Sequence, residues 1–183
     1  ILKQRVWTNY LSFKTWIFSI KSWALLNTEN PSFETKVIRP LMENADITED
    51  QAKDIKNVYT RILEVYNSLV SENDKESSKI AKRIITRTHL LSLVPLTLQS
   101  INDNIKVSDY IGFIKKFFAG KKSATINEIY NNAAGSNSAS AENVKKRITA
   151  ITEAFKAYFK VETELKQELK PVKRFEGYVE DNK

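Results

Sequence analysis

The sequence predicts an all-α protein, folded as an irregular bundle of about six helices. Glycine and proline number only four each among 183 residues, too few for the tight turns of an all-β fold. The rest of the chain is rich in Leu, Lys, Glu, Ile and Ala, which favour helices. Apolar residues also recur at steps of three and four over long stretches. A hydrophobic fraction of 42% is sufficient for a core in a chain of this length.

Residues 2–26 are predicted to form a helix that is apolar over most of its circumference. Such a helix must be covered on several sides, either within the core or by a partner. Lys14 and Lys21 interrupt the apolar run, which makes it a poor membrane span, and we expect no membrane contact; an interfacial membrane helix is the weaker alternative. The candidate interface on this helix consists of its three tryptophans, Trp7, Trp16 and Trp23.

Residues 33–42, which include Pro40, are expected to contribute only a helical turn or two. A helix from Thr48 to about Ser71 follows. The Thr48 hydroxyl can accept from a free backbone amide, and Gln51 can reach back in a capping box. Two acidic residues in the first turn lie at the positive end of the helix dipole. The expected inner face is made of Ala52, Ile55, Tyr59, Ile62, Tyr66 and Leu69.

Three further helices are expected in the middle of the chain. The first is one long helix over residues 75–102, with a kink or break near Leu91 because Pro95 lies inside it. A shorter helix follows and ends at Gly120, since glycine suits the left-handed residue after a helix. The third is a short helix over roughly residues 126–133.

Residues 135–140 have the composition of a flexible connector. Ser140 then caps a last long helix, about residues 141–169, whose apolar residues keep a nearly heptad spacing until Pro171 ends it. We therefore expect three parts, namely an N-terminal helical part over residues 1–72, a basic helical part over 73–170 and a tail over 171–183.

The net charge of +7 is concentrated in the second part of the chain. Residues 1–72 contain nine Lys and Arg against nine Asp and Glu, whereas residues 75–160 contain fifteen against six. A concentrated positive field attracts polyanions such as nucleic acid, an anionic membrane or an acidic protein. A solvated surface that keeps the protein in solution is the alternative explanation.

Three basic clusters supply the candidate nucleic-acid-binding residues. Steps of four place Lys79, Arg83 and Arg87 on one helix face, where each could contact a phosphate and release a counterion. The second cluster, Lys121 and Lys122, precedes a hydroxyl-rich helix start, which is a typical anion site. The third cluster, residues 145–147, places positive charge at the start of the last helix, where it opposes the helix dipole. Pairing with acids or simple surface charge is the alternative for each cluster. The candidates are Lys79, Lys82, Arg83, Arg87, Lys121, Lys122, Lys145, Lys146 and Arg147.

The sequence offers no recognisable catalytic centre. It contains no cysteine, which excludes disulfides, thiolate metal sites and cysteine nucleophiles. His89 is the only histidine, so a site built on several histidines is excluded as well. A packing role is favoured for His89, and a lone catalytic base is the alternative. Phosphate-binding glycine loops and nucleophile elbows are also missing, so we expect no enzyme activity in this chain, no cofactor and no metal.

Two segments carry a family resemblance. One is Arg83-Ile-Ile-Thr-Arg-Thr-His89-Leu-Leu, and the other runs from Gly135 to Arg147 ahead of an amphipathic helix. Together they resemble the helical C-terminal region of bacterial proteins that begin with a ParB/sulfiredoxin-like domain, a group that includes GmrSD-like restriction enzymes and related phage-defence proteins. The resemblance covers about residues 75–165 and implies a helical region that supports a catalytic domain and contacts DNA or a partner. The family's Asp-Gly-Gln-Arg-type and His-Asn-His motifs do not occur here, so no catalytic residue is carried over.

We therefore expect an accessory helical domain of a bacterial DNA-processing or phage-defence protein, located in the cytoplasm. The chain begins at Ile1 rather than Met, which suggests a fragment with a catalytic domain N-terminal to Ile1 as one partner. DNA is the other expected partner, and a homo-oligomer is a further option. The alternative is a protein–protein scaffold that makes no nucleic-acid contact and docks through the broad apolar face of its first helix.

Overall fold

The computed structural model describes residues 10–29, 31–119 and 125–168, and side chains for residues 17–29, 31–119 and 126–160. The predicted all-α class is confirmed for these residues, which contain no strand. They form eight helices rather than about six, because two predicted elements turn out differently: residues 33–42 contribute a full helix, and the helix expected over 75–102 is divided in two. The helices are α2 (Tyr10–Asn27), α3 (Thr35–Asn44), α4 (Glu49–Ser71), α5 (Lys75–Ile84), α6 (Arg87–Asn102), α7 (Val107–Ala119), α8 (Thr125–Ala134) and α9 (Ala141–Glu168).

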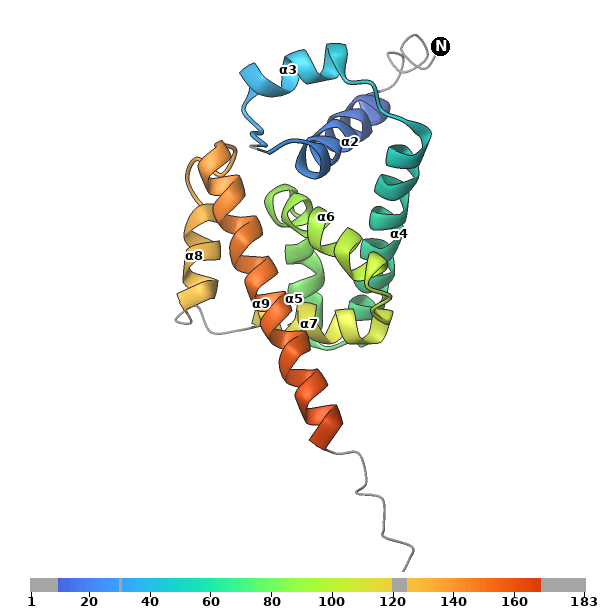
Figure 1. Ribbon diagram of the computed structural model, residues 1–183, viewed down its shortest axis with the longest axis vertical. Helices are drawn as coiled ribbons and strands as arrows, with labels where there is room; N and C mark the ends of the chain where they lie inside the picture. The colour runs from blue at the N-terminus through green and yellow to red at the C-terminus, as the bar shows by residue number, and fades with distance from the viewer. Residues whose placement is uncertain (1–9, 30, 120–124, 169–183) are drawn as a thin grey trace, which may run out of the picture.

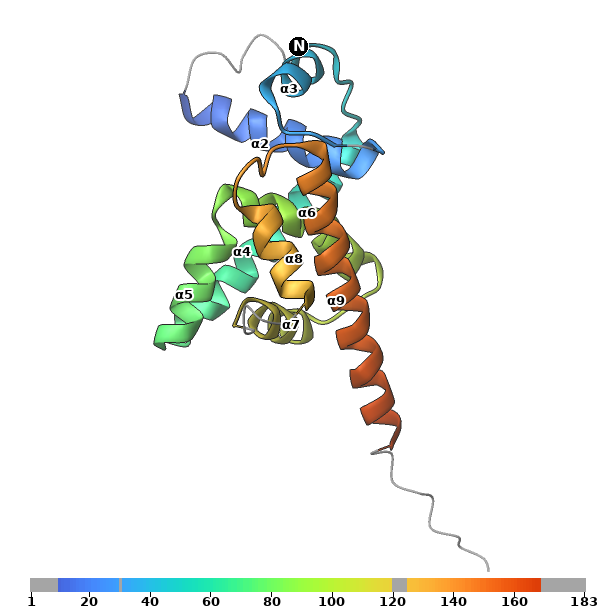
Figure 2. The same ribbon diagram turned by 90° about the vertical axis from the view of Figure 1, so that its left-hand side faces the viewer.

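The helices form a body from which one helix projects. α2 and α3 lie across one end of the molecule, and α4, α5, α6 and α7 form its middle (Figure 1). α8 packs along α9, and the C-terminal part of α9 extends beyond the body in both views (Figures 1 and 2). Figure 2 shows α5, α8 and α9 in that order across the face turned toward the viewer.

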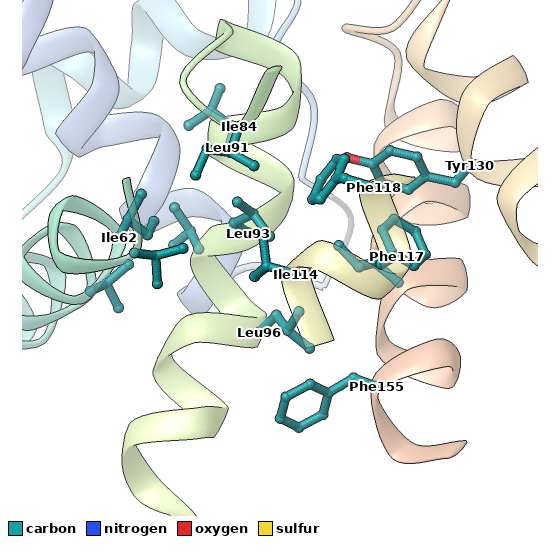
Figure 3. Packing of buried hydrophobic residues seen from close by; sticks show 14 of the residues in the cluster. Ile62, Ile84, Leu91, Leu93, Leu96, Ile114, Phe117, Phe118, Tyr130 and Phe155 are labelled. Atoms are coloured by element: carbon teal, nitrogen blue, oxygen red, sulfur yellow. The ribbon is translucent and has the colours of Figure 1, made fainter. Parts of the chain in front are cut away.

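A cluster of buried apolar side chains joins helices from α2 to α9. Leu93 of α6 lies near its centre, and Phe117 and Phe118 of α7 gather with Tyr130 of α8 on one side of it (Figure 3). The rings of Phe117 and Tyr130 meet edge to face with centroids 5.1 Å apart. The boundary expected near residue 72 falls at the turn between α4 and α5, and the cluster takes residues from both sides of that turn.

The start of α4 confirms the predicted capping box. The Gln51 amide donates to Thr48 Oγ1 over 3.3 Å, and the Thr48 amide donates to Gln51 Oε1 over 3.1 Å. The inner face differs from the predicted one, since Ala52 is exposed and Tyr59 and Tyr66 are half-buried. The buried residues of α4 are Ile55, Val58, Ile62, Val65 and Leu69.

The helix expected over residues 75–102 is divided, but not near Leu91. α5 ends at Ile84, and Thr86 has extended backbone angles, φ −68° and ψ 146°, before α6 begins. Pro95 lies inside α6 instead, and the residues on either side of it are buried in the core. Proline has no backbone N–H, so one hydrogen bond of the helix is missing at Pro95. The packing of the neighbouring residues in the core keeps the helix continuous there.

The division of the helix separates the predicted row of cations. Lys79, Lys82 and Arg83 belong to α5, whereas Arg87 is the first residue of α6. The prediction that steps of four place the row on one helix face is wrong, because the extended residue Thr86 interrupts the helix within the row.

α2 packs against the core and is hydrogen-bonded to α4. Trp23 is half-buried, and its Nε1 donates to Gln51 Oε1 over 2.9 Å. Trp7 lies outside the described residues, as does the side chain of Trp16, so only Trp23 of the predicted interface can be placed. In the part of the chain that the structure describes, no helix combines the length and the apolar character needed to cross a membrane.

The serine-rich connector before α9 is held by long-range hydrogen bonds. The Phe33 amide donates to the carbonyl of Ala139 over 2.8 Å, and the Ser32 hydroxyl donates to the same carbonyl over 3.3 Å. Ser140 caps α9 as predicted, since its hydroxyl accepts from the Asn143 amide over 3.3 Å. The segment between α2 and α3 is thereby fastened to the start of α9.

Candidate functional site

An open hollow lies between the end of α5, the start of α6 and the C-terminal half of α8. Its volume is about 800 Å³. The hollow brings two residues singled out in the sequence, Arg83 and His89, together with residues of a helix about forty positions later. Its lining combines guanidinium, imidazole, carboxylate and amide groups and consists of Arg83, His89, Glu128, Asn131, Asn132, Ala134 and Gly135.

Arg83 is held in the wall of the hollow by three uncharged acceptors. Its Nε donates to His89 Nε2 over 3.4 Å, Nη1 to the carbonyl of Phe118 over 3.2 Å, and Nη2 to Asn131 Oδ1 over 2.5 Å. Its Cζ also lies 5.1 Å from the centroid of the Phe118 ring, a cation–π contact. Because no described carboxylate forms an ion pair with Arg83, its positive charge is not neutralised.

His89 is kept neutral between Arg83 and Tyr130. Since Nε2 accepts from Arg83, the proton of the neutral ring lies on Nδ1, which donates to the Tyr130 hydroxyl over 2.9 Å. Burial first, and then the charges of Arg83 and Arg147, lower the pKa of His89 to about 4. Burial raises the pKa of Tyr130 to about 12, so the phenol stays protonated. The imidazole is thus a neutral, fixed part of the wall at neutral pH.

Arg147 departs most from the predicted basic surface, because its side chain is only 1% exposed. Nε donates to Ser92 Oγ over 3.0 Å, and Nη1 donates to the carbonyls of Ala133 and Ser138 over 2.7 and 2.8 Å. These bonds satisfy carbonyls at the end of α8 and in the connector, where a helix leaves its last carbonyls unpaired. The prediction that Arg147 lies on an exposed face is wrong, because the folded chain offers the side chain these inward acceptors.

The other predicted cations differ in exposure and pairing. Lys146 is exposed and pairs with Glu142 one turn earlier, with Nζ and Oε1 2.6 Å apart. An exposed pair of this kind contributes little to stability and can yield to a competing anion. Lys121 and Lys122 lie outside the described residues. Of the predicted nucleic-acid-binding residues, four are exposed and form no ion pair with any described residue, namely Lys79, Lys82, Arg87 and Lys145.

The arginines near the start of α6 lower the pKa values of neighbouring bases, and none of them forms an ion pair with a described acid. Arg87 contributes, after burial, to lowering the pKa of Lys21 to about 8, and Arg83 and Arg147 act in the same direction on His89. Such shifts arise where positive groups lie near each other and no acid compensates them. We call this positive region the α6 basic region; it consists of Lys21, Arg83, Arg87 and Arg147.

The α8 side of the hollow was not recognised in the sequence. Glu128, Asn131 and Asn132 lie at spacings of three and four, which places them on one face of a helix. Tyr130 is buried and Ile126 half-buried on the apolar side of the same helix. The polar face was therefore visible in the sequence, but only tertiary packing shows that it meets Arg83.

A comparison with protein-family models, with curated proteins and with solved structures gives no match. Among the residues that the structure describes, no group of three or more His, Cys, Asp or Glu side chains is placed to hold a metal ion. A fixed guanidinium without an acidic partner, beside amide donors in an open hollow, is suited to binding an anion.

Proposed function

We propose that the chain is an accessory helical domain of a bacterial DNA-processing or phage-defence protein. In this proposal the exposed cations Lys79, Lys82 and Arg87 contact nucleic-acid phosphates, and the buried members of the α6 basic region, Lys21 and Arg147, add to the positive field. The observation that carries the proposal is the positive charge without acidic partners around the first turn of α6. The resemblance of residues 75–165 to the helical region of such proteins supports the same function.

The members of the basic set would have different roles in this contact. Lys79, Lys82 and Arg87 are exposed and would meet phosphates directly, releasing condensed counterions. Arg83 lies deeper and would contact only a group that enters the hollow. Arg147 is buried and would contribute to the positive field without touching the ligand.

The salt dependence of DNA binding tests the proposal. The triple variant Lys79→Gln, Lys82→Gln and Arg87→Gln removes three exposed cations. We expect the slope of log K against log salt concentration to become shallower by about 3, since each lost phosphate contact accounts for about 0.9 of the slope. The measurement is fluorescence anisotropy with a duplex that carries 5′-hydroxyl ends, over a range of salt concentrations.

A matched control separates contact from overall charge. The variant Lys53→Gln, Lys56→Gln and Lys156→Gln removes the same charge from exposed positions on α4 and α9, outside the predicted basic set. It is expected to leave most of the slope in place. Equal slopes for the two triple variants, or no binding by the parent at low salt, would contradict the proposal.

A further inference from the structure

Arg83 has a fixed position in the wall of the hollow and retains N–H groups that can bind a ligand. A guanidinium carries five N–H groups, and the three bonds to described acceptors leave two of them. Three contacts and the face of the Phe118 ring fix its orientation, so little rotamer entropy would be lost on binding. The remaining N–H groups, one on Nη1 and one on Nη2, can each donate to an oxygen of a bound phosphate.

Asn131 supplies the donor next to Arg83. Its Oδ1 accepts from Arg83 Nη2, so the amide oxygen faces the guanidinium and the two Nδ2 hydrogens remain for another group. Asn132 lines the same hollow. The hollow therefore offers several N–H donors around one fixed positive charge.

The charges around the hollow favour an anion, with one opposing group. Arg83 and Arg147 carry full charges, while the carbonyls they bind near the ends of α7 and α8 represent only about half a negative unit per helix end. The first turn of α6, which contains His89, adds a partial positive charge. Glu128 is the opposing group, an exposed carboxylate in the lining.

We propose that this hollow binds a single phosphate group of a phosphomonoester, held by Arg83 and the amide of Asn131. The inference rests on the proposed function in taking phosphate as the ligand, and it adds the class of phosphate. A monoester offers three outer oxygens and two negative charges, whereas a diester within a chain offers two oxygens and one charge and is flanked on both sides. The recessed Arg83 suits the terminal group, and the exposed cations suit phosphates within a chain.

Two nearly isosteric substitutions test the site, and they are expected to change the phosphate affinity in opposite directions. Asn131→Asp places a carboxylate against Arg83 and neutralises the guanidinium without emptying any space. Isothermal titration with inorganic phosphate and with a nucleoside 5′-monophosphate, at constant ionic strength, should show affinity falling at least about tenfold. Glu128→Gln removes the opposing charge from an exposed position and should raise the affinity severalfold.

Stability measured on the same samples separates binding from folding. Because the new carboxylate would pair with Arg83, we expect Asn131→Asp to melt at or above the temperature of the parent. Lost phosphate affinity in a folded Asn131→Asp variant, together with tighter binding by Glu128→Gln, supports the site. No phosphate binding by the parent at about 10 mM, or unchanged affinity in both variants, would overturn it.

Two further probes identify the source of the phosphate. If the site takes a nucleic-acid end, a 5′-phosphorylated oligonucleotide binds tighter than its 5′-hydroxyl counterpart, and Asn131→Asp removes the difference. If the nucleoside monophosphate binds while the two oligonucleotides do not differ, the site stands and takes a free nucleotide. The proposed function fails separately, when the Lys79, Lys82 and Arg87 variant leaves the salt slope unchanged.

Discussion

Replacing Arg147 by methionine tests whether this arginine holds the fold together or contacts a ligand. Methionine keeps much of the volume but none of the three hydrogen bonds to Ser92, Ala133 and Ser138. A buried carbonyl left without a donor costs about 1–3 kcal/mol, and two carbonyls lose theirs. Removing a buried charge offsets part of this loss. We expect the free energy of unfolding to fall by about 3 kcal/mol.

Urea titration followed by tryptophan fluorescence, together with calorimetry, measures this loss. For a chain of this size, a loss of about 3 kcal/mol corresponds to a melting temperature lower by about 6–12 °C. Lys145→Met is the control on the same helix, because Lys145 is exposed and a surface change of this kind stays within about 0.5 kcal/mol. Arg147→Met with the stability of the parent but without DNA binding would show that the side chain turns outward and would refute the reasoning.

Three further predictions concern buried charge and helix capping. His89 has a pKa of about 4 in the folded state, below that of the unfolded chain, so stability is present at neutral pH and is lost as the pH falls from about 6.5 toward 4. Between pH 7 and pH 4.5, chemical denaturation should show the parent losing about 2 kcal/mol more of its free energy of unfolding than His89→Gln loses. This figure is already reduced because His89 is partly exposed. Equal losses in the two proteins would contradict the lowered pKa. At pH 7, Lys21→Met should raise the free energy of unfolding by about 1 kcal/mol, because it removes a buried cation near Arg87. This gain should shrink above pH 8, where Lys21 is already neutral in the folded protein. An unchanged denaturation midpoint at pH 7 would be evidence against a buried charge at this position. Thr48→Ala should cost about 1 kcal/mol in thermal denaturation by removing the capping box of α4, and no loss would mean that Gln51 or water replaces the cap.

Local chemistry in the sequence predicted several elements well. Thr48 and Gln51 cap α4 as their spacing requires, and Ser140 caps α9. The sequence predicts a break near Leu91, whereas the chain breaks between Ile84 and Arg87, because Pro95 is the stronger local signal for a break. The burial of the residues around Pro95 is a property of the whole core, which a single sequence does not display.

The candidate site was predicted only in part, for a related reason. Arg83 and His89 are six positions apart, and their proximity follows from one segment of chain. Asn131 reaches Arg83 through the packing of α8, and Arg147 turns inward toward Ser92, which lies on another helix. Charge counts cannot distinguish an arginine on the surface from one whose acceptors are assembled by folding.

The connector before α9 has a practical consequence for protein engineering. Its composition would recommend it as a place to insert a tag or to open the chain for circular permutation. The carbonyl of Ala139 accepts a hydrogen bond from the Phe33 amide, and the carbonyl of Ser138 accepts one from Arg147. Inserted residues would move these acceptors away from their donors. Insertions at this loop should therefore loosen both the segment before α3 and the start of α9, and a better location is a turn without such hydrogen bonds to distant residues.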